Sequence, residues 1–221
     1  MYLLALLDAC VEAGVQRFAP SVWYGKHSKS TLCAVHQKLR LPIIDAVQKS
    51  GIEYTIFMVG HLLDYFAAPQ KSTSYLQTFP IIVDINKCTA AFVGTGDEPF
   101  CVTAIDDVGQ YVAAALDLKT WEPEMGISGS RTCWNDVIRL GEKLRCRKFE
   151  VKRMTPEECL ATRVPNPPTT RTNQLQEWLI SYYCDEIDYE PTLNNKFPHL
   201  KATTLEEFMN KWWAGKESQT F

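Results

Sequence analysis

Two neighbouring stretches decide the fold of this chain: Gly14–Ser21 (GVQRFAPS) and Gly51–His61 (GIEYTIFMVGH). The first holds a short apolar run, Phe18–Ala19, which Pro20 ends because proline has no N–H to give to a strand ladder. The second holds Tyr54–Val59, an unbroken apolar and β-branched run. Such a run is typical of a strand buried on both faces, as in the parallel sheet of an α/β protein. The order of strand, loop, helix and strand therefore predicts an α/β fold.

The helix between these two strands carries Pro42. Proline costs about 3 kcal/mol inside a helix but little in its first turn. We therefore expect the helix to span Leu41–Lys49, with a kinked helix that begins at Ala34 as the alternative. Ligands of α/β sheets bind beyond the carboxyl ends of the strands. Because these ends are Pro20-Ser21 and Gly60-His61, the sequence predicts a ligand site between them.

Further elements surround this unit. Apolar residues at helical spacing predict a helix over Tyr2–Ala13, and we expect a short helix over His61–Phe66. Turn residues within 79–93 predict a hairpin insertion. The next helix is expected to begin with a cap from Asp106 or Asp107.

Tryptophan and proline become more frequent from Leu118 onward, which suggests a division of the chain into regions 1–117 and 118–221. In the second region, Thr155 begins a helix with a capping-box pattern, and Val164–Thr170 is predicted to be a proline-rich loop.

Composition excludes several functional classes. The net charge of −3 offers no basic footprint for nucleic acid, and no run approaches the ~20 apolar residues of a membrane span. The eight cysteines contain no Cys-x-x-Cys pair and have no nearby histidine at metal-ligand spacing. We therefore expect reduced thiols, no metal site and a cytoplasmic protein.

Several short motifs together resemble the NmrA-like / isoflavone reductase-like family, especially its fungal branch. They are Arg17–Ser21 with Tyr24-Gly25, Ile52–Thr55 with Gly60 and Asp64–Phe66, and Ala104–Gly109. Members of this family are atypical short-chain-dehydrogenase-type Rossmann proteins that bind NADP(H). The resemblance therefore implies a Rossmann-like parallel sheet in region 1–117 and a smaller mixed α/β, substrate-covering region in 118–221.

One family motif is missing from this sequence. The family normally opens with a strand and a Gly-x-x-Gly-x-x-Gly loop, whose backbone N–H groups hold the cofactor's pyrophosphate. The nearest glycine pair here, Gly94-Thr95-Gly96, lies between two strand-like runs and is interpreted as a turn. The resemblance thus implies a partial Rossmann-like fold that lacks its N-terminal glycine-rich half and begins before the fifth sheet strand.

The resemblance also implies a catalytic lysine in the helix before the Tyr54-Thr55 strand. An ungapped count back from Gly51 places Arg40 at the family's lysine position, and Lys38 lies two residues earlier. Lysine can be tuned to exchange a proton, whereas arginine stays charged. Lys38 is therefore the catalytic candidate.

Cofactor and substrate candidates lie at the strand ends. The resemblance implies that the cofactor is bound by Pro20, Ser21, Met58, Val59, Gly60 and His61. It implies that Tyr65 and Phe66 wall the substrate pocket. Ordinary core or turn roles remain the alternative for each of these residues.

The function that the resemblance implies is NAD(P)H-dependent oxidoreduction. The expected substrate is a small aromatic or polyketide-like metabolite, reduced at a carbonyl or conjugated double bond in secondary-metabolite biosynthesis. One alternative is a non-catalytic regulator that senses the dinucleotide and binds a transcription factor. Another is an inactive truncated remnant. A protein partner or a homo-oligomer is compatible with each of these functions.

Overall fold

The computed structural model of the 221-residue chain describes residues 2–26, 32, 34–162 and 171–216. Its strands are β1 (Arg17–Phe18), β2 (Glu53–Tyr54), β3 (Ile56–Met58), β4 (His61–Leu62), β5 (Val83–Asp84), β6 (Thr89–Val93), β7 (Phe100–Thr103), β8 (Glu124–Gly126), β9 (Ser130–Thr132) and β10 (Glu150–Met154). Its helices are α1 (Tyr2–Glu12), α2 (Ala34–Lys49), the 3-10 helix η2 (Leu63–Ala67), α3 (Ile105–Ala115), α4 (Trp134–Arg145), α5 (Pro156–Ala161), α6 (Arg171–Tyr183), α7 (Thr192–Lys196) and α8 (Leu205–Trp213). The α/β class predicted from the sequence is confirmed.

Parallel pairing organises the first part of the chain. β1 pairs with β2, β3 with β8, and β4 with β7, all in parallel, while β9 pairs with β7 antiparallel. The run 54–59 changes neighbours at Thr55, whose N–H donates to the Phe18 carbonyl at 3.3 Å. The next N–H, that of Ile56, donates to the Pro123 carbonyl at 2.9 Å. The run that the sequence predicts as one strand therefore forms two strands, β2 and β3, which pair with different neighbours.

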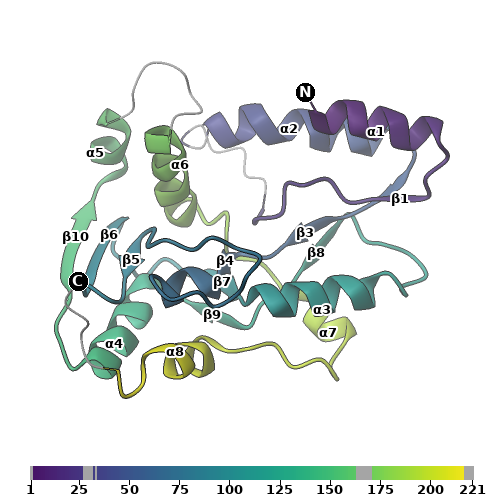
Figure 1. Cartoon of the computed structure of the whole chain (residues 1–221). Coiled ribbons are helices and arrows are strands. Elements are labelled where there is room, and N and C mark those ends of the chain that lie inside the picture. The colour runs from purple at the N-terminus through teal and green to yellow at the C-terminus, as the bar shows by residue number, and fades with distance from the viewer. Residues whose placement is uncertain (1, 27–31, 33, 163–170, 217–221) are drawn as a thin grey trace.

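Helices cover both faces of these strands. Figure 1 shows α1 and α2 on one side of β1 and β3, with α3 and α7 on the other. Successive side chains of a strand point to opposite faces. Accordingly, Ile56 packs with Leu7 of α1 and Val47 of α2, whereas Phe57 packs with Tyr111 of α3. This confirms that the apolar run is buried on both faces.

A second sheet has the strand order β10–β6–β5. β5 and β6 pair antiparallel, with Val83 opposite Ala90 and Asp84 opposite Thr89, which confirms the hairpin predicted within 79–93. The large core beside this sheet contains Trp134 of α4. The regions 1–117 and 118–221 remain a predicted division; β8 and β9 of the second region pair with β3 and β7 of the first. The loop expected at 164–170 lies outside the described residues.

The predicted start of α2 is wrong. The helix begins at Ala34, with Pro42 inside it. Proline removes the N–H that would bond the carbonyl of Lys38, but Pro42 is exposed, so water can satisfy that carbonyl. The following turns bury Ile43 and Val47, and this packing offsets the helical defect.

The helix predicted from His61 is also wrong at its first two residues. His61 and Leu62 form β4 because they pair with Val102 and Thr103 of β7. The helical part is the 3-10 helix that begins at Leu63 and ends before the cis Ala68–Pro69 bond. The sheet ladder overrides the local helical preference here.

The cap predicted for α3 comes from a different aspartate. Ala104 occupies the N-cap position and provides no side-chain cap. The Ile105 N–H instead donates at 2.8 Å to the buried carboxylate of Asp64, which also accepts the Ser72 hydroxyl at 2.7 Å. Asp107 accepts the Thr203 N–H at 2.7 Å rather than capping its own helix.

Asp64→Ala is expected to lower the free energy of unfolding by about 1–3 kcal/mol. The substitution leaves two partly buried donors, the Ile105 N–H and the Ser72 hydroxyl, without their acceptor. Asp106→Ala is the matched control, because Asp106 is exposed and does not cap α3. Urea unfolding of both variants measures the difference, and equal losses would contradict the cap assignment.

Candidate functional site

The carboxyl ends of β1 and β3 meet through the loop that follows β1. The Tyr24 carbonyl accepts the N–H of Val59 at 3.0 Å and that of Gly60 at 2.7 Å. Tyr24 also forms an isolated parallel bridge with Met58. These bonds fix the loop against the end of β3 and bring the two predicted strand ends together.

A cavity of about 210 Å³ lies at this edge of the sheet. Its lining comes from the β1 loop, α2, the β3–β4 junction, η2, the segment before β5, and α6. The lining residues are Trp23, Tyr24, Arg40, Val59, Gly60, His61, Leu62, Tyr65, Ile81, Trp178 and Tyr182. Aromatic walls with few polar groups are typical of small-molecule sites.

The cavity gathers part of the predicted site. Val59, Gly60, His61 and Tyr65 line it. The remaining candidates lie elsewhere among the described residues: Pro20 is buried beside the loop, Ser21 and Lys38 are exposed, Met58 lines a different cleft, and Phe66 is buried behind His61. The roles assigned to these residues stay predictions.

The start of α2 decides which cation reaches the cavity. Arg40 lies in its lining, with the guanidinium carbon 5.0 Å from the centre of the Tyr24 ring. This distance is that of a cation–π contact. Lys38 occupies an exposed position of the same helix. The cation at the cavity is therefore an arginine, which stays protonated.

His61 is held inside a cluster of aromatic rings. Its ring stacks on Phe66 with centroids 4.8 Å apart and meets Trp134 edge-on at 5.7 Å. Its Nδ1 lies 2.5 Å from the Tyr182 hydroxyl. Burial lowers the pKa of His61 to about 3, so the imidazole is neutral at neutral pH.

Hydroxyl groups of α6 bond the polar side chains of this cluster. Ser181 donates to the Trp178 carbonyl at 2.7 Å, since a carbonyl can only accept. Tyr24, 2.8 Å from Ser181, therefore donates to the Ser181 oxygen. The Tyr182 hydroxyl is bonded to Nδ1 of His61, so this bond occupies one nitrogen of the imidazole.

The Nε2 atom of His61 is buried and has no hydrogen-bond partner among the described residues. Leaving a buried polar atom unpaired costs about 1–3 kcal/mol. On the side of the cavity, the bonds to Ser181 and to His61 orient the Tyr24 and Tyr182 hydroxyls.

A comparison with protein families identifies the family of the chain. The model of the NmrA-like family matches residues 3–209. The chain belongs to the NmrA-like family.

Two curated relatives of this NmrA-like chain are fungal. Oxidoreductase BOA1 of Botryotinia fuckeliana is 33% identical over 136 residues, which cover 61% of the chain and 45% of BOA1. Oxidoreductase swnN of Metarhizium robertsii is 23% identical over 185 residues, which cover 76% of the chain and 54% of swnN. The NmrA-like chain therefore spans about half the length of these relatives.

Solved structures share the fold. AtPrR2 with NADP+ and (+)pinoresinol has a TM-score of 0.71 and 19% identity, covering 95% of the NmrA-like chain and 69% of that structure. The leucoanthocyanidin reductase–NADPH complex from Vitis vinifera has a TM-score of 0.70 and 16% identity, covering 95% of the NmrA-like chain and 70% of that structure. These likenesses confirm the Rossmann-like fold class.

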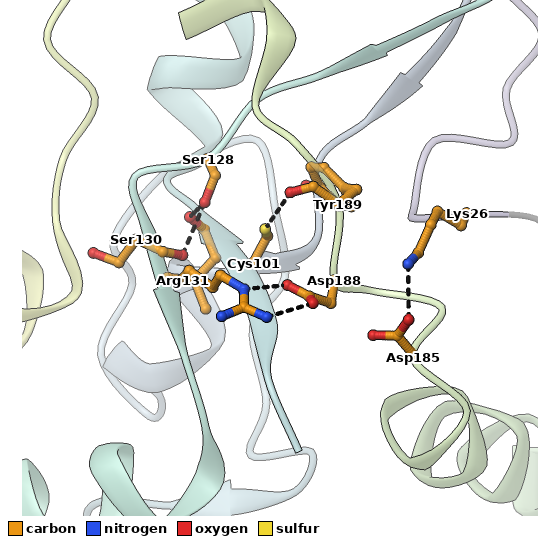
Figure 2. Close-up of polar contacts among 9 residues, drawn as sticks. Lys26, Cys101, Ser128, Ser130, Arg131, Asp185, Asp188 and Tyr189 are labelled. Atoms are coloured by element: carbon orange, nitrogen blue, oxygen red, sulfur yellow. Dashed lines mark hydrogen bonds and ion pairs between the residues drawn. The ribbon is translucent and has the colours of Figure 1, made fainter. Parts of the chain in front are cut away.

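A second, wider cleft of about 890 Å³ lies beside β3, β8 and β9 of the NmrA-like chain. Figure 2 shows two ion pairs at this cleft. Arg131 donates two bonds to Asp188, at 2.5 and 2.6 Å, and holds the pKa of that carboxyl below its usual range. Lys26 pairs with Asp185 at 2.9 Å. The smaller cavity is the better candidate site, because four of the predicted site residues line it and only Met58 lines the cleft.

Sequence reasoning missed several cavity residues. Trp23 and Tyr24 follow the first strand directly, and their place in a loop at a strand end was an available signal. Ile81, Trp178 and Tyr182 come from distant elements and carry no local signal.

Among the described residues, no helix is long and apolar enough to cross a membrane. No group of three potential metal ligands occurs in this described part of the chain either.

Proposed function

We propose that this NmrA-like chain is an NADP(H)-dependent oxidoreductase that reduces a small aromatic or polyketide-like metabolite. The supporting observation is the cavity, which has aromatic walls and lies where the carboxyl ends of β1 and β3 meet. Ligands bind at such edges of α/β sheets. The setting that the family resemblance implies, cytoplasmic secondary-metabolite biosynthesis, is part of this proposal.

The cavity fits a ring rather than a whole dinucleotide. Its 210 Å³ equals about seven water molecules at ~30 Å³ each. A nicotinamide or a small aromatic substrate matches this size and these flat walls. When bound, NADP(H) supplies a hydride. The cavity residues that would hold the nicotinamide end are Tyr24, Arg40 and the chain at Val59–Gly60.

The side chains of the cavity have separate tasks in this proposal. Arg40 provides a permanent positive charge beside the Tyr24 ring and favours an oxygen that gains negative charge during reduction. Ser181 holds the Tyr24 hydroxyl, and His61 holds that of Tyr182. Trp23 and Trp178 add large apolar rings to the lining, which limit the access of water.

Arg40→Ala is expected to reduce NADPH oxidation with aromatic carbonyl compounds by about 10- to 100-fold, because bonds to charged groups are worth ~1.5–3 kcal/mol. Lys38→Ala is the matched control on the same helix and is expected to retain activity, since Lys38 is exposed outside the cavity. Loss of activity in Lys38→Ala with Arg40→Ala unaffected would overturn the proposed role of Arg40.

The second candidate is a non-catalytic regulator that senses the dinucleotide and binds a transcription factor. One observation favours it: the cation of the cavity is an arginine, which cannot exchange a proton as a lysine can. Capture of a transcription factor by a chain that binds NADPH but does not oxidise it would support the regulator over the enzyme.

A further inference from the structure

Three phenol side chains line the cavity: Tyr24, Tyr65 and Tyr182. Each carries one hydroxyl proton and can donate one hydrogen bond. The Tyr24 hydroxyl is bonded to Ser181 at 2.8 Å, and the Tyr182 hydroxyl is bonded to Nδ1 of His61 at 2.5 Å. Two of the three hydroxyls are therefore engaged within the protein.

Tyr65 differs from the other two phenols. Its side chain is half-buried, and its hydroxyl makes no hydrogen bond to any residue that the structure describes. Tyr65 and Tyr182 belong to the same cluster, because their ring centroids lie 5.7 and 5.9 Å from that of His61 and both residues line the cavity. The cavity thus contains one phenol proton that is not used by another side chain of the described chain.

The Tyr65 ring is held in place although its hydroxyl is not bonded. The ring meets His61 at a tilt with centroids 5.7 Å apart and meets Phe79 edge-on at 5.8 Å. Its helix, η2, is anchored by the neighbouring Asp64, which binds Ile105 and Ser72. Burial raises the pKa of Tyr65, and the Asp64 carboxylate adds to this effect, so the hydroxyl stays a donor at neutral pH.

The other polar side chains at this place define what Tyr65 can meet. Arg40 carries only donors, and the Nε2 atom of His61 is buried inside the aromatic cluster. A ligand in the cavity therefore meets donors from side chains on two sides and flat apolar walls elsewhere. This arrangement favours an aromatic ligand that carries an acceptor oxygen.

We propose that the Tyr65 hydroxyl donates the hydrogen bond that recognises the carbonyl oxygen of an aromatic ketone or aldehyde in this cavity. The inference rests on the proposed function for the role of the cavity as a substrate site. It adds two points, namely the residue that binds the carbonyl oxygen and the chemical class of the ligand. Tyr65 orients and polarises the carbonyl, while the aromatic walls hold the ring.

The test compares two probes of nearly the same shape, acetophenone and α-methylstyrene, in which a methylene group replaces the carbonyl oxygen. Both are titrated into the 221-residue chain without cofactor, and tryptophan fluorescence reports binding because Trp23 and Trp178 line the cavity. The wild-type chain is expected to prefer acetophenone by about 5-fold, the value of one neutral hydrogen bond. Tyr65→Phe is expected to bind both probes equally.

Tyr75→Phe is the matched control, since Tyr75 is 87% exposed and far from the lining. It should keep the wild-type preference. Tyr65→Phe should also keep the wild-type urea midpoint, because no hydrogen bond of the folded chain is lost. A preference for acetophenone that survives Tyr65→Phe, or absence of saturable binding of both probes, would overturn the inference. Because no cofactor is present, these outcomes are separate from a failure of NADPH oxidation.

Discussion

Gly60→Ala is expected to lower the free energy of unfolding by about 3–5 kcal/mol. Gly60 joins β3 to β4 with a φ of +65°, a conformation that side chains disfavour. A Cβ atom there would lie 2.2 Å from the Cys101 carbonyl oxygen and 3.0 Å from the Tyr189 hydroxyl. Because the carbonyl belongs to the central strand β7, neither side can move without breaking sheet pairing.

Gly14→Ala separates the two contributions. Gly14 has nearly the same φ, +67°, but no atom lies within 4 Å of a Cβ built there. Its substitution should cost only about 1–2 kcal/mol, the penalty of the left-handed conformation. Urea unfolding of both variants measures the difference. Equal losses would show that the contact between Gly60 and β7 is not close in solution.

The second large effect concerns pH. Between pH 7 and pH 4.5, the wild-type chain is expected to lose about 2–3 kcal/mol more stability than His61→Gln. The pKa of folded His61 is lowered to about 3, whereas an unfolded histidine binds a proton below about 6.5. The unfolded state therefore binds more protons across this window, so stability falls as the pH falls.

Carboxylates also titrate in this range, so only the difference between variants is informative. His199→Gln provides the control, because it makes the same change from histidine to glutamine at an exposed position. It should show the wild-type loss on acidification. If His61→Gln and wild type lose stability in parallel, His61 is not held neutral by burial.

Local chemistry made much of the fold predictable. The unbroken run 54–59 indicated strand structure buried on both faces, and Ile56 and Phe57 lie in different cores. The Thr155 capping box is present, with Glu158 bonded to the cap. The structure departs from the sequence interpretation where distant contacts decide. The cap of α3 comes from Asp64, and the burial of Ile43 and Val47 keeps Pro42 within α2.

The candidate site was predictable in part for the same reason. Gly60 and His61 follow a buried strand, and the carboxyl ends of neighbouring strands meet at one edge. Trp178 and Tyr182 come from α6, more than a hundred residues later, and only the packing of that helix against the sheet places them in the lining. The choice between Lys38 and Arg40 depended on where α2 begins, which Pro42 obscured.

The most direct test of the proposed function is an equilibrium titration of the 221-residue chain with NADPH, followed by tryptophan fluorescence. Trp23 and Trp178 line the cavity, so a nicotinamide ring bound there should quench their emission. Arg40→Ala should weaken the binding, whereas Lys38→Ala should not. Saturable quenching at micromolar NADPH is the expected result; absence of binding at millimolar NADPH would contradict the proposal that this cavity serves an NADP(H)-dependent oxidoreductase.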